Sequence, residues 1–279
     1  MSLREVIEQY DGRLTAADRR LVHELLSNSA EGAFLSATNL AQRVGVHPAA
    51  AVRLARKLGF SGYPELRAQL QSQLIADSGP ADRVRHRLAH IDDETILDAL
   101  VRSEIIALRD LNQHVSQARV DEAAEALIRA RKVFLFGHGH AVAIVELMQR
   151  RLRRSGLDVV VLVGPGRELA ERALPLGSDD ALLAFAFHSI PPGLVALITH
   201  AKNAGAATLL ISDLMGPMVR PQPDILLAAP RGGMAEEFQT GTVPTLICNA
   251  LVLTIARLDK GRSLHTLDQL NGLIEAFDR

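Results

Sequence analysis

The sequence predicts an all-α N-terminal domain joined to a three-layer α/β domain. Residues 1–75 read as short helices with little strand signal, and apolar residues such as Leu21, Leu25 and Leu26 recur there at helical spacing. From Lys132 onward, five apolar runs of strand length alternate with segments of helical length: VFLFG, DVVVLVG, ALLAFAF, ATLLIS and DILLAA. Alternation of this kind, with nearly continuous apolar strands, is typical of a parallel sheet covered by helices on both faces. We therefore expect a five-stranded parallel sheet in the second domain.

Breaks in the pattern divide the chain, whose 279 residues fit about two domains. Asp77-Ser78-Gly79-Pro80 interrupts the first helical pattern and is the best candidate linker. A long amphipathic helix follows, with an apolar stripe from Ile96 to Val115. We expect a helical domain at 1–77, a linker and connecting helix at 78–118, and the α/β domain at 119–279. The last of these closes with helices at about 242–259 and 264–277.

The composition is that of a globular chain, with 48% hydrophobic and 23% charged residues. The net charge of −1 indicates no particular partner, so any basic surface must be local. Cys248 is the only cysteine; it cannot form an internal disulfide, fits a reducing cytoplasm, and is expected to be a small core residue. The first residues lack the apolar segment that a signal peptide contains. The longest apolar stretch, from Thr245 to Leu258, is too short to span a bilayer comfortably. We expect a cytoplasmic protein without a membrane segment.

Residues 36–63 carry the strongest local signal, which is that of a helix-turn-helix unit. Ser36 suits the N-cap of a first helix, and Gly45 can provide the left-handed turn that ends it. Val46 is the apolar residue that a tight corner buries, and Pro48 suits the first turn of the next helix.

Basic residues gather in this unit. Between Ser36 and Leu70 there are five basic residues and one acidic residue, a balance of +4 in a chain of net charge −1. A local positive face on two short helices suits contact with DNA phosphates and entry into the major groove, and small residues would allow close approach to base edges. A plain helical hairpin with a solvated basic face is the alternative. The predicted DNA-contacting residues are Arg43, His47, Ala49, Ala50, Arg53, Arg56 and Lys57.

These motifs resemble the N-terminal domain of the RpiR family of regulators. The matching elements are Leu40-Ala41, Gly45-Val46, Val52-Arg53 and the run from Arg56 to Tyr63, RKLGFSGY. The chain departs from the family at two positions. His47 stands where the family usually has Ser, and Ala50 stands near the position of the usual Thr. A helix-capping hydroxyl and a possible phosphate or base contact are therefore absent, while the fold prediction is unchanged. The resemblance implies double-stranded DNA as a partner.

In this family the second domain is a SIS (sugar isomerase) domain, and the sequence from about residue 120 looks like one. The resemblance implies a flavodoxin-like strand order, 2-1-3-4-5, with a ligand at the switch point between the first and third strands. Glycines in a loop that follows a strand and opens a helix suit an anion, because backbone N–H groups at the helix start face it. A second loop, Phe187 to Gly193, follows the third strand. The predicted effector-binding residues are Gly137, His138, Gly139, His140, Ala141, His188 and Ser189.

Two features set these loops apart from those of SIS domains that bind phosphosugars. Ala141 stands at the first serine position, and the second loop keeps Ser189 without a clear Ser-Gly-x-Thr. His138, His140 and His188 could instead donate to an anion, titrate near neutral pH or bind a metal; they could also be loop residues partly exposed to water. We expect no metal, since no carboxylate or cysteine joins them at ligand spacing.

The sequence leaves open the roles of two groups of charged residues. Glu236 and Glu237 follow the fifth strand, where an isomerase would place a base, but a solvated pair is the simpler reading. The run Arg150-Arg151-Leu152-Arg153-Arg154 could touch DNA or a partner, or form a solvated helix face.

Three functions follow from these patterns. The first is a non-enzymatic transcription regulator without a cofactor, controlling a carbohydrate or related catabolic operon in response to a small anionic metabolite such as a sugar phosphate. The others are a sugar-phosphate isomerase with a helical extension and a regulator whose second domain only dimerises. Because the stripes at 96–115 and 245–258 offer more apolar surface than one domain needs, we expect a homo-oligomer, a dimer or a tetramer.

Overall fold

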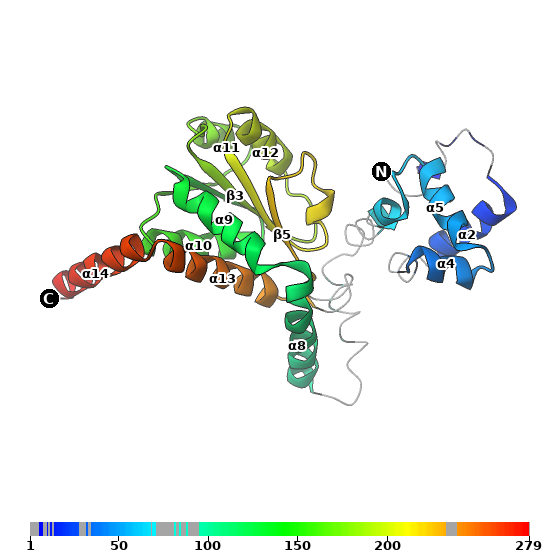
Figure 1. Ribbon diagram of the computed structural model, residues 1–279, viewed down its shortest axis with the longest axis horizontal. Coiled ribbons are helices and arrows are strands. Elements are labelled where there is room, and N and C mark those ends of the chain that lie inside the picture. The colour runs from blue at the N-terminus through cyan, green and yellow to red at the C-terminus, as the bar shows by residue number, and fades with distance from the viewer. Residues whose placement is uncertain are drawn as a thin grey trace. The chain divides into compact units, whose positions relative to one another are not determined.

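The computed structural model describes residues 6, 7, 10, 12, 14–27, 32, 35–67, 69, 70, 81, 84, 88, 95–232 and 239–278. The described residues form two compact units, one reaching residue 88 and one starting at residue 95 (Figure 1). The predicted linker Asp77–Pro80 and the Glu236–Glu237 pair lie outside the described residues. The domain boundaries at 77 and 118 stay predictions.

The first unit is helical, as expected. Its helices include α2 (Ala16–Ser27), α4 (Ala37–Arg43) and α5 (Pro48–Lys57), and residues 63–67 are also helical. Apolar residues at helical spacing meet in one core, because each helix buries one face. Tyr63 lies in that core and donates its hydroxyl to the Leu35 carbonyl oxygen at 3.1 Å. The largest fully buried side chains of this core are those of Leu21, Leu25, Leu40, Leu54 and Leu66.

The second unit is built on a parallel sheet whose five described strands follow the order β2-β1-β3-β4-β5. This order confirms the flavodoxin-like prediction. Because β1 and β3 are neighbours in space, the loops that follow them start side by side; Gly137 pairs in register with Phe185. The strands are β1 (Val133–Gly137), β2 (Val159–Leu162), β3 (Ala181–Ala186), β4 (Ala207–Ser212) and β5 (Ile225–Ala228).

Helices cover both faces of the sheet, so the three-layer prediction is confirmed (Figure 1). Neighbouring residues of β1 point to opposite faces: Leu135 joins one core and Phe134 the other. One face packs α8 (Ile96–His114), α9 (Gln117–Arg129), α10 (Ala141–Arg154) and α13 (Thr242–Leu258). The other packs α11 (Gly166–Ala173) and α12 (Leu194–Asn203), and a short 3-10 helix, η1 (Gly216–Met218), follows β4.

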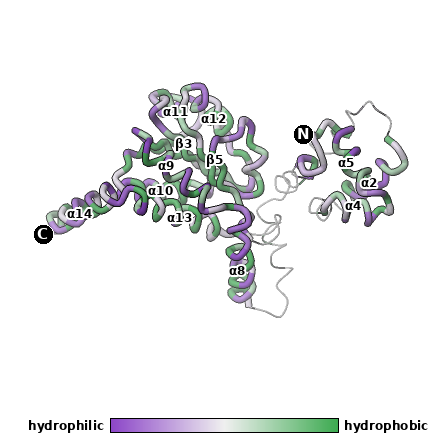
Figure 2. Tube along the Cα trace, in the orientation of Figure 1, coloured by the Kyte–Doolittle hydropathy of each residue, from purple (hydrophilic) through white to green (hydrophobic). Residues whose placement is uncertain are grey.

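The two last helices differ in burial. Helix α13 fills the core with Val243, Ile247 and Leu251, and Cys248 beside them is fully buried, as predicted. Burial raises the pKa of the Cys248 thiol to about 12, so this thiol is unreactive at neutral pH. Helix α14 (Lys260–Phe277) instead projects from the domain with apolar residues along it (Figure 2). Among helices in the described part of the chain, none alone could cross a membrane; only α13 and α14 together, across a bend of 104°, reach that length and composition.

Candidate DNA-binding and effector sites

The turn between α4 and α5 has the geometry that the sequence predicted. Ser36 caps α4, its Oγ accepting the Asn39 N–H at 3.1 Å. Gly45 has φ +67°, a left-handed conformation that a residue with a Cβ rarely adopts. The Val46 N–H then donates to the Ala41 carbonyl oxygen at 2.9 Å, which closes the corner, and Val46 packs against the core.

His47 replaces the missing capping hydroxyl. It is the N-cap of α5, and its Nδ1 accepts the Ala49 N–H at 3.2 Å, while Pro48 is the first helical residue. The capping hydroxyl is absent, as the sequence indicates, but the helix keeps a side-chain cap. An imidazole nitrogen that carries no proton has an acceptor lone pair and can do what the serine oxygen does.

Helix α5 separates the predicted DNA-contacting residues into two sets. Arg53 and Arg56 are exposed and Ala49 is partly exposed, and their spacing of four and three residues puts them on one face. Ala50 is only 3% exposed and belongs to the core, which contradicts its prediction as a DNA-contacting residue. The helical period turns Ala50 and Leu54 inward together, because they are four residues apart.

Two of the predicted basic residues already have acidic partners on α2. Arg43 Nε lies 2.8 Å from Glu24 Oε1, and Lys57 Nζ lies 2.5 Å from Asp18 Oδ2. The side chain of Asp18 is only 4% exposed. Burial acts to raise the pKa of Asp18, but hydrogen bonds from Lys57 and Thr15 outweigh it and hold that pKa below its usual value. Lys57 thus ties α5 to α2, which leaves Arg53 and Arg56 as the best candidates for phosphate contact.

The loop after β1 is a tight glycine turn. A Cβ at Gly137 would lie 2.7 Å from Val145 Cγ2, so glycine is required for α10 to pack close to the strand. Gly139 has φ +58°, and His138, Gly139 and His140 are all exposed. The N–H groups of Ala141 and Val142 donate to the carbonyl oxygens of His138 and Gly139. Those two amides therefore stabilise the turn, and an anion at this loop would be held by other groups.

The loop after β3 is held by a buried carboxylate. His188 has φ +71°, which is uncommon for a residue with a side chain. Its backbone N–H donates to Asp213 Oδ2 at 2.8 Å, so this amide does not face a ligand. Ser189 is exposed, and Phe187 and His188 are partly buried. The predicted effector-binding residues thus lie on two loops that start from adjacent strands.

Asp213 and Arg231 complete this cluster, although the sequence analysis did not name them. Asp213 follows β4, is 3% exposed, and also accepts Arg231 Nε–H at 3.0 Å and the Met215 N–H at 3.0 Å. The Arg231 guanidinium lies 5.2 Å from the centroid of the Phe187 ring, a cation–π distance. The signal that was available is positional: both residues follow apolar strands, where ligand-site residues of parallel sheets gather.

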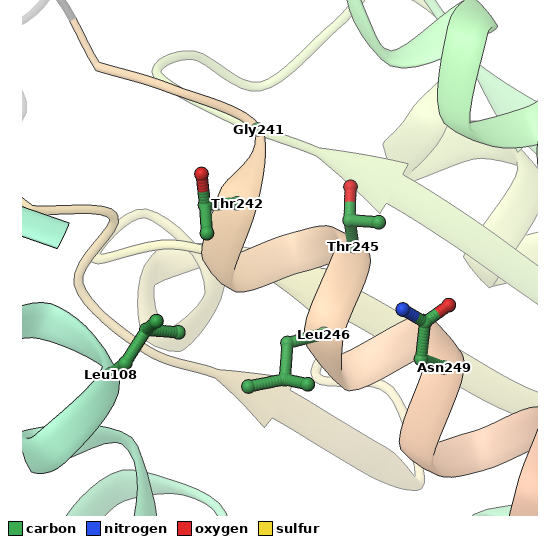
Figure 3. Close-up of a pocket in the computed structure, with 6 residues that line it drawn as sticks. All are labelled: Leu108, Gly241, Thr242, Thr245, Leu246 and Asn249. Carbon is green, nitrogen blue, oxygen red and sulfur yellow. The ribbon is translucent and has the colours of Figure 1, made fainter. Parts of the chain in front are cut away.

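A separate open pocket of about 500 Å³ lies between α8 and the start of α13 (Figure 3). Leu108 of α8 and Leu246 of α13 face each other across it. Asn249 lines the same pocket, and its Oδ1 is buried with no hydrogen-bond partner within the described residues. The remaining lining residues are Gly241, Thr242 and Thr245. Sequence periodicity did not indicate this pocket, because it depends on how two helices cross.

Comparisons with known proteins identify the N-terminal domain. The model described as "Helix-turn-helix domain, rpiR family" matches residues 1–77. The chain is 28% identical over 224 residues to the HTH-type transcriptional regulator HexR of Pseudomonas aeruginosa, which covers 78% of this chain and 76% of HexR. Residues 1–77 therefore match the helix-turn-helix domain of the rpiR family, and the chain is similar over most of its length to a transcriptional regulator.

Solved structures share the fold of this chain. The Vibrio vulnificus NanR protein complexed with ManNAc-6P aligns with a TM-score of 0.60 and 16% identity, over 99% of this chain and 97% of NanR. The sugar isomerase domain of the RpiR transcription factor from Sphaerobacter thermophilus aligns with a TM-score of 0.59 and 20% identity, over 64% of this chain and 99% of that domain. The second unit therefore has the SIS fold that the sequence predicted.

Among the described residues, other charged groups are engaged within the second unit or lack a metal-binding arrangement. Arg150 pairs with Glu146 at 2.7 Å, and Arg153 donates to the Val159 carbonyl oxygen at 3.3 Å. These contacts favour the reading of the arginine run as a helix face. Within the described residues, no group of three or more His, Cys, Asp or Glu side chains could hold a metal ion.

Proposed function

We propose that this RpiR-family regulator contacts operator DNA through the exposed face of α5 and controls a carbohydrate or related catabolic operon. The observation that carries the proposal is the placement of Arg53 and Arg56 on one solvent-facing side of a capped helix that follows a tight turn. A recognition helix needs such a face, because its outward side chains must reach phosphates and base edges. Arg43, His47, Ala49 and Lys57 flank that face and are secondary contact candidates.

The test is a gel-shift titration with the DNA upstream of the protein's own gene and of its neighbours. Binding should be specific, and log Kd should depend linearly on log salt, because phosphate contacts release counterions. A chain that binds these fragments no better than unrelated DNA would contradict the proposal.

We further propose that the SIS domain binds a small anionic metabolite, such as a sugar phosphate or a sugar acid, beside the loops after β1 and β3. The support is the adjacency of Gly137 and Phe185, which brings the two loops together, and the exposure of His138, His140 and Ser189. The fold shared with NanR, which was solved with ManNAc-6P, makes that sugar phosphate the first probe to try. Several of the hydroxyl groups that usually bind the phosphate in SIS domains are missing here. The imidazoles and the remaining loop amides would therefore provide more of the contacts to the anion, and we expect modest affinity.

We infer that the regulator acts as a dimer or a larger homo-oligomer in the bacterial cytoplasm and performs no catalysis. The support for association is exposed apolar side chains on helices of the second unit, with Leu97 of α8 at 69% and Leu253 of α13 at 70%. Two copies would place two helix-turn-helix units on half-sites separated by a multiple of about 10 bp. Light scattering of the full chain tests this, and a monomer at micromolar concentration would contradict it.

A further inference from the structure

Helix α14 contacts the second unit through its first turns and then leaves it. A Cβ at Gly156, in the turn after α10, would lie 2.7 Å from both Arg262 Cγ and Thr266 Oγ1, so the start of α14 packs closely there. From residue 267 to residue 277 the side chains are exposed, except that of Leu270, which is partly buried. About three turns of α14 therefore project from the single chain (Figure 1).

The projecting part of α14 has the apolar spacing of a helix that pairs with another helix. Its apolar stripe follows intervals of three, four and three residues: Leu267, Leu270, Ile274 and Phe277. This spacing is that of a coiled-coil seam, which is narrower than the apolar face of a helix packed on a globular core. A helix of three turns is marginal in water by itself, and Gly272 in its middle weakens it further. We therefore expect the stripe to be covered in the working protein.

The apolar area that α14 presents is close to what one side of a stable dimer interface needs. Five large apolar residues of the helix are between 40% and 83% exposed: Leu264, Leu267, Leu273, Ile274 and Phe277. At roughly 150–250 Å² for each residue, they present on the order of 500 Å² of apolar surface. A stable homodimer buries roughly 800 Å² on each partner, of which about 65% is apolar. A second copy of the same helix is therefore a sufficient cover.

The charges of α14 favour a like helix as the occupant of this stripe. Between Leu267 and Phe277 the charged residues are Asp268 and Glu275. They are seven residues apart, so they lie on one side of the helix, and each follows a seam residue on the side that faces away from the seam. Two copies of α14 can therefore meet along the stripe without bringing like charges together.

The distribution of charge along α14 favours an antiparallel pair. The helix starts with the basic residues Lys260 and Arg262, and Asp278 follows its last turn. An antiparallel arrangement brings each acidic end near the basic start of the other helix and opposes the two helix dipoles. A parallel arrangement would bring like charges together at both ends.

From this geometry we propose that α14 of one copy pairs antiparallel with α14 of a second copy and joins the two chains. Leu267 then lies opposite the partner's Phe277, and Leu270 lies opposite the partner's Ile274, because each pair is symmetric about the middle of the projecting segment. The inference rests on the proposed self-association and names the helix, the direction and the register that bring it about.

The test is disulfide cross-linking of the full chain, in which the native thiol of Cys248 is buried and unreactive at neutral pH. A Leu267→Cys protein is mixed with a Phe277→Cys protein and mildly oxidised. Linked heterodimers should exceed linked homodimers of either variant at least about fivefold, because a disulfide requires Cα atoms within about 7 Å. The matched control replaces Phe277→Cys by Ala276→Cys, on the neighbouring exposed residue that faces away from the seam, and should give few links to Leu267→Cys.

Light scattering of two glutamate variants gives a second measurement that needs no cross-link. Ile274→Glu should raise the dissociation constant of self-association at least about tenfold, because it places an unpaired charge in the seam, whereas Ala276→Glu should leave the constant nearly unchanged. Equal constants for these two variants would overturn the pairing, as would homodimer links in excess or equal linking of Ala276→Cys. A dimer without the link between positions 267 and 277 contradicts the pairing alone. A monomer at micromolar concentration contradicts the proposed self-association as well, and failure to bind DNA leaves the cross-links unchanged.

Discussion

Lys57 Nζ lies 2.5 Å from Asp18 Oδ2, so the helix that carries the predicted DNA-contacting face is tied to α2 by an ion pair. Asp18 also joins the start of α2 to Thr15: the Thr15 N–H donates to the carboxylate at 2.8 Å, and the Asp18 N–H donates to Thr15 Oγ1 at 3.2 Å. One carboxylate therefore serves both as part of a reciprocal cap and as the partner of a lysine 39 residues away. The position of α5 depends on this side chain.

Loss of this ion pair should loosen the first unit, with a defined dependence on pH. Lys57→Met should destabilise the unit by about 1–2 kcal/mol, because a charged hydrogen bond is lost while a nearly buried carboxylate remains. The pKa of Asp18 is lowered in the folded state, so its contribution is present above the unfolded pKa, near 3.8, and is lost as pH falls below that value. Hydrogen exchange of the α5 amides in the full chain measures both effects. Lys202→Met, which removes a partner of Asp224 in the second unit, is the control and should leave α5 unchanged.

Arg53 and Arg56 should account for much of the electrostatic part of DNA binding. Replacing both by Ala should weaken operator binding at least about tenfold and lower the slope of log Kd against log salt by about 2, since each phosphate contact contributes close to one unit. Arg167→Ala with Arg172→Ala on α11 gives a matched loss of two charges from the second unit. An unchanged salt slope in the Arg53/Arg56 variant would remove these residues from the interface.

His47 should be replaceable by serine but not by alanine. In His47→Ala the Ala49 N–H loses its side-chain acceptor, and we expect α5 to lose about 1 kcal/mol of local stability, as N-cap deletions do. His47→Ser restores an acceptor of the type usual in the family and should recover most of that loss. Exchange rates of the first α5 amides distinguish the two variants, and equal rates in both would mean that the Nδ1 contact contributes nothing.

The sequence was sufficient for features that depend on local spacing, and insufficient for those that depend on contacts between distant segments. Gly45, Pro48 and the five apolar runs were identified because turn chemistry and periodicity are local. The burial of Ala50 was misjudged, since three consecutive alanines offer no contrast by which to choose the inward face. Asp213 and Arg231 meet across 18 residues and two strand ends, and only the strand order brings them together. The pocket at Leu108 and Leu246 likewise requires the crossing of α8 and α13.

Self-association should depend on the outer face of α13. Leu253→Glu places a charge on a side chain that is 70% exposed in the single chain and should weaken self-association at least about tenfold if a partner subunit covers it, because a buried unpaired charge is costly. Leu174 is exposed to a similar degree, at 76%, at the end of α11 on the opposite layer, so Leu174→Glu is the control. Light scattering across a concentration series gives the dissociation constants. Equal constants for the two variants would exclude this face of α13 from the interface.

Effector binding should depend on the two loops after β1 and β3. Gly139 has φ +58°, so Gly139→Val strains the turn after β1 and should reduce affinity for an anionic sugar at least about tenfold. His138→Ala and His188→Ala should reduce it less, each by removing one imidazole that can donate to an anion. Calorimetry with ManNAc-6P, other phosphorylated sugars and sugar acids measures these affinities. Gly166→Val, at another glycine with positive φ but on the loop after β2, is the control. Binding that survives Gly139→Val, His138→Ala and His188→Ala together would place the pocket elsewhere and favour a domain that serves to join two subunits.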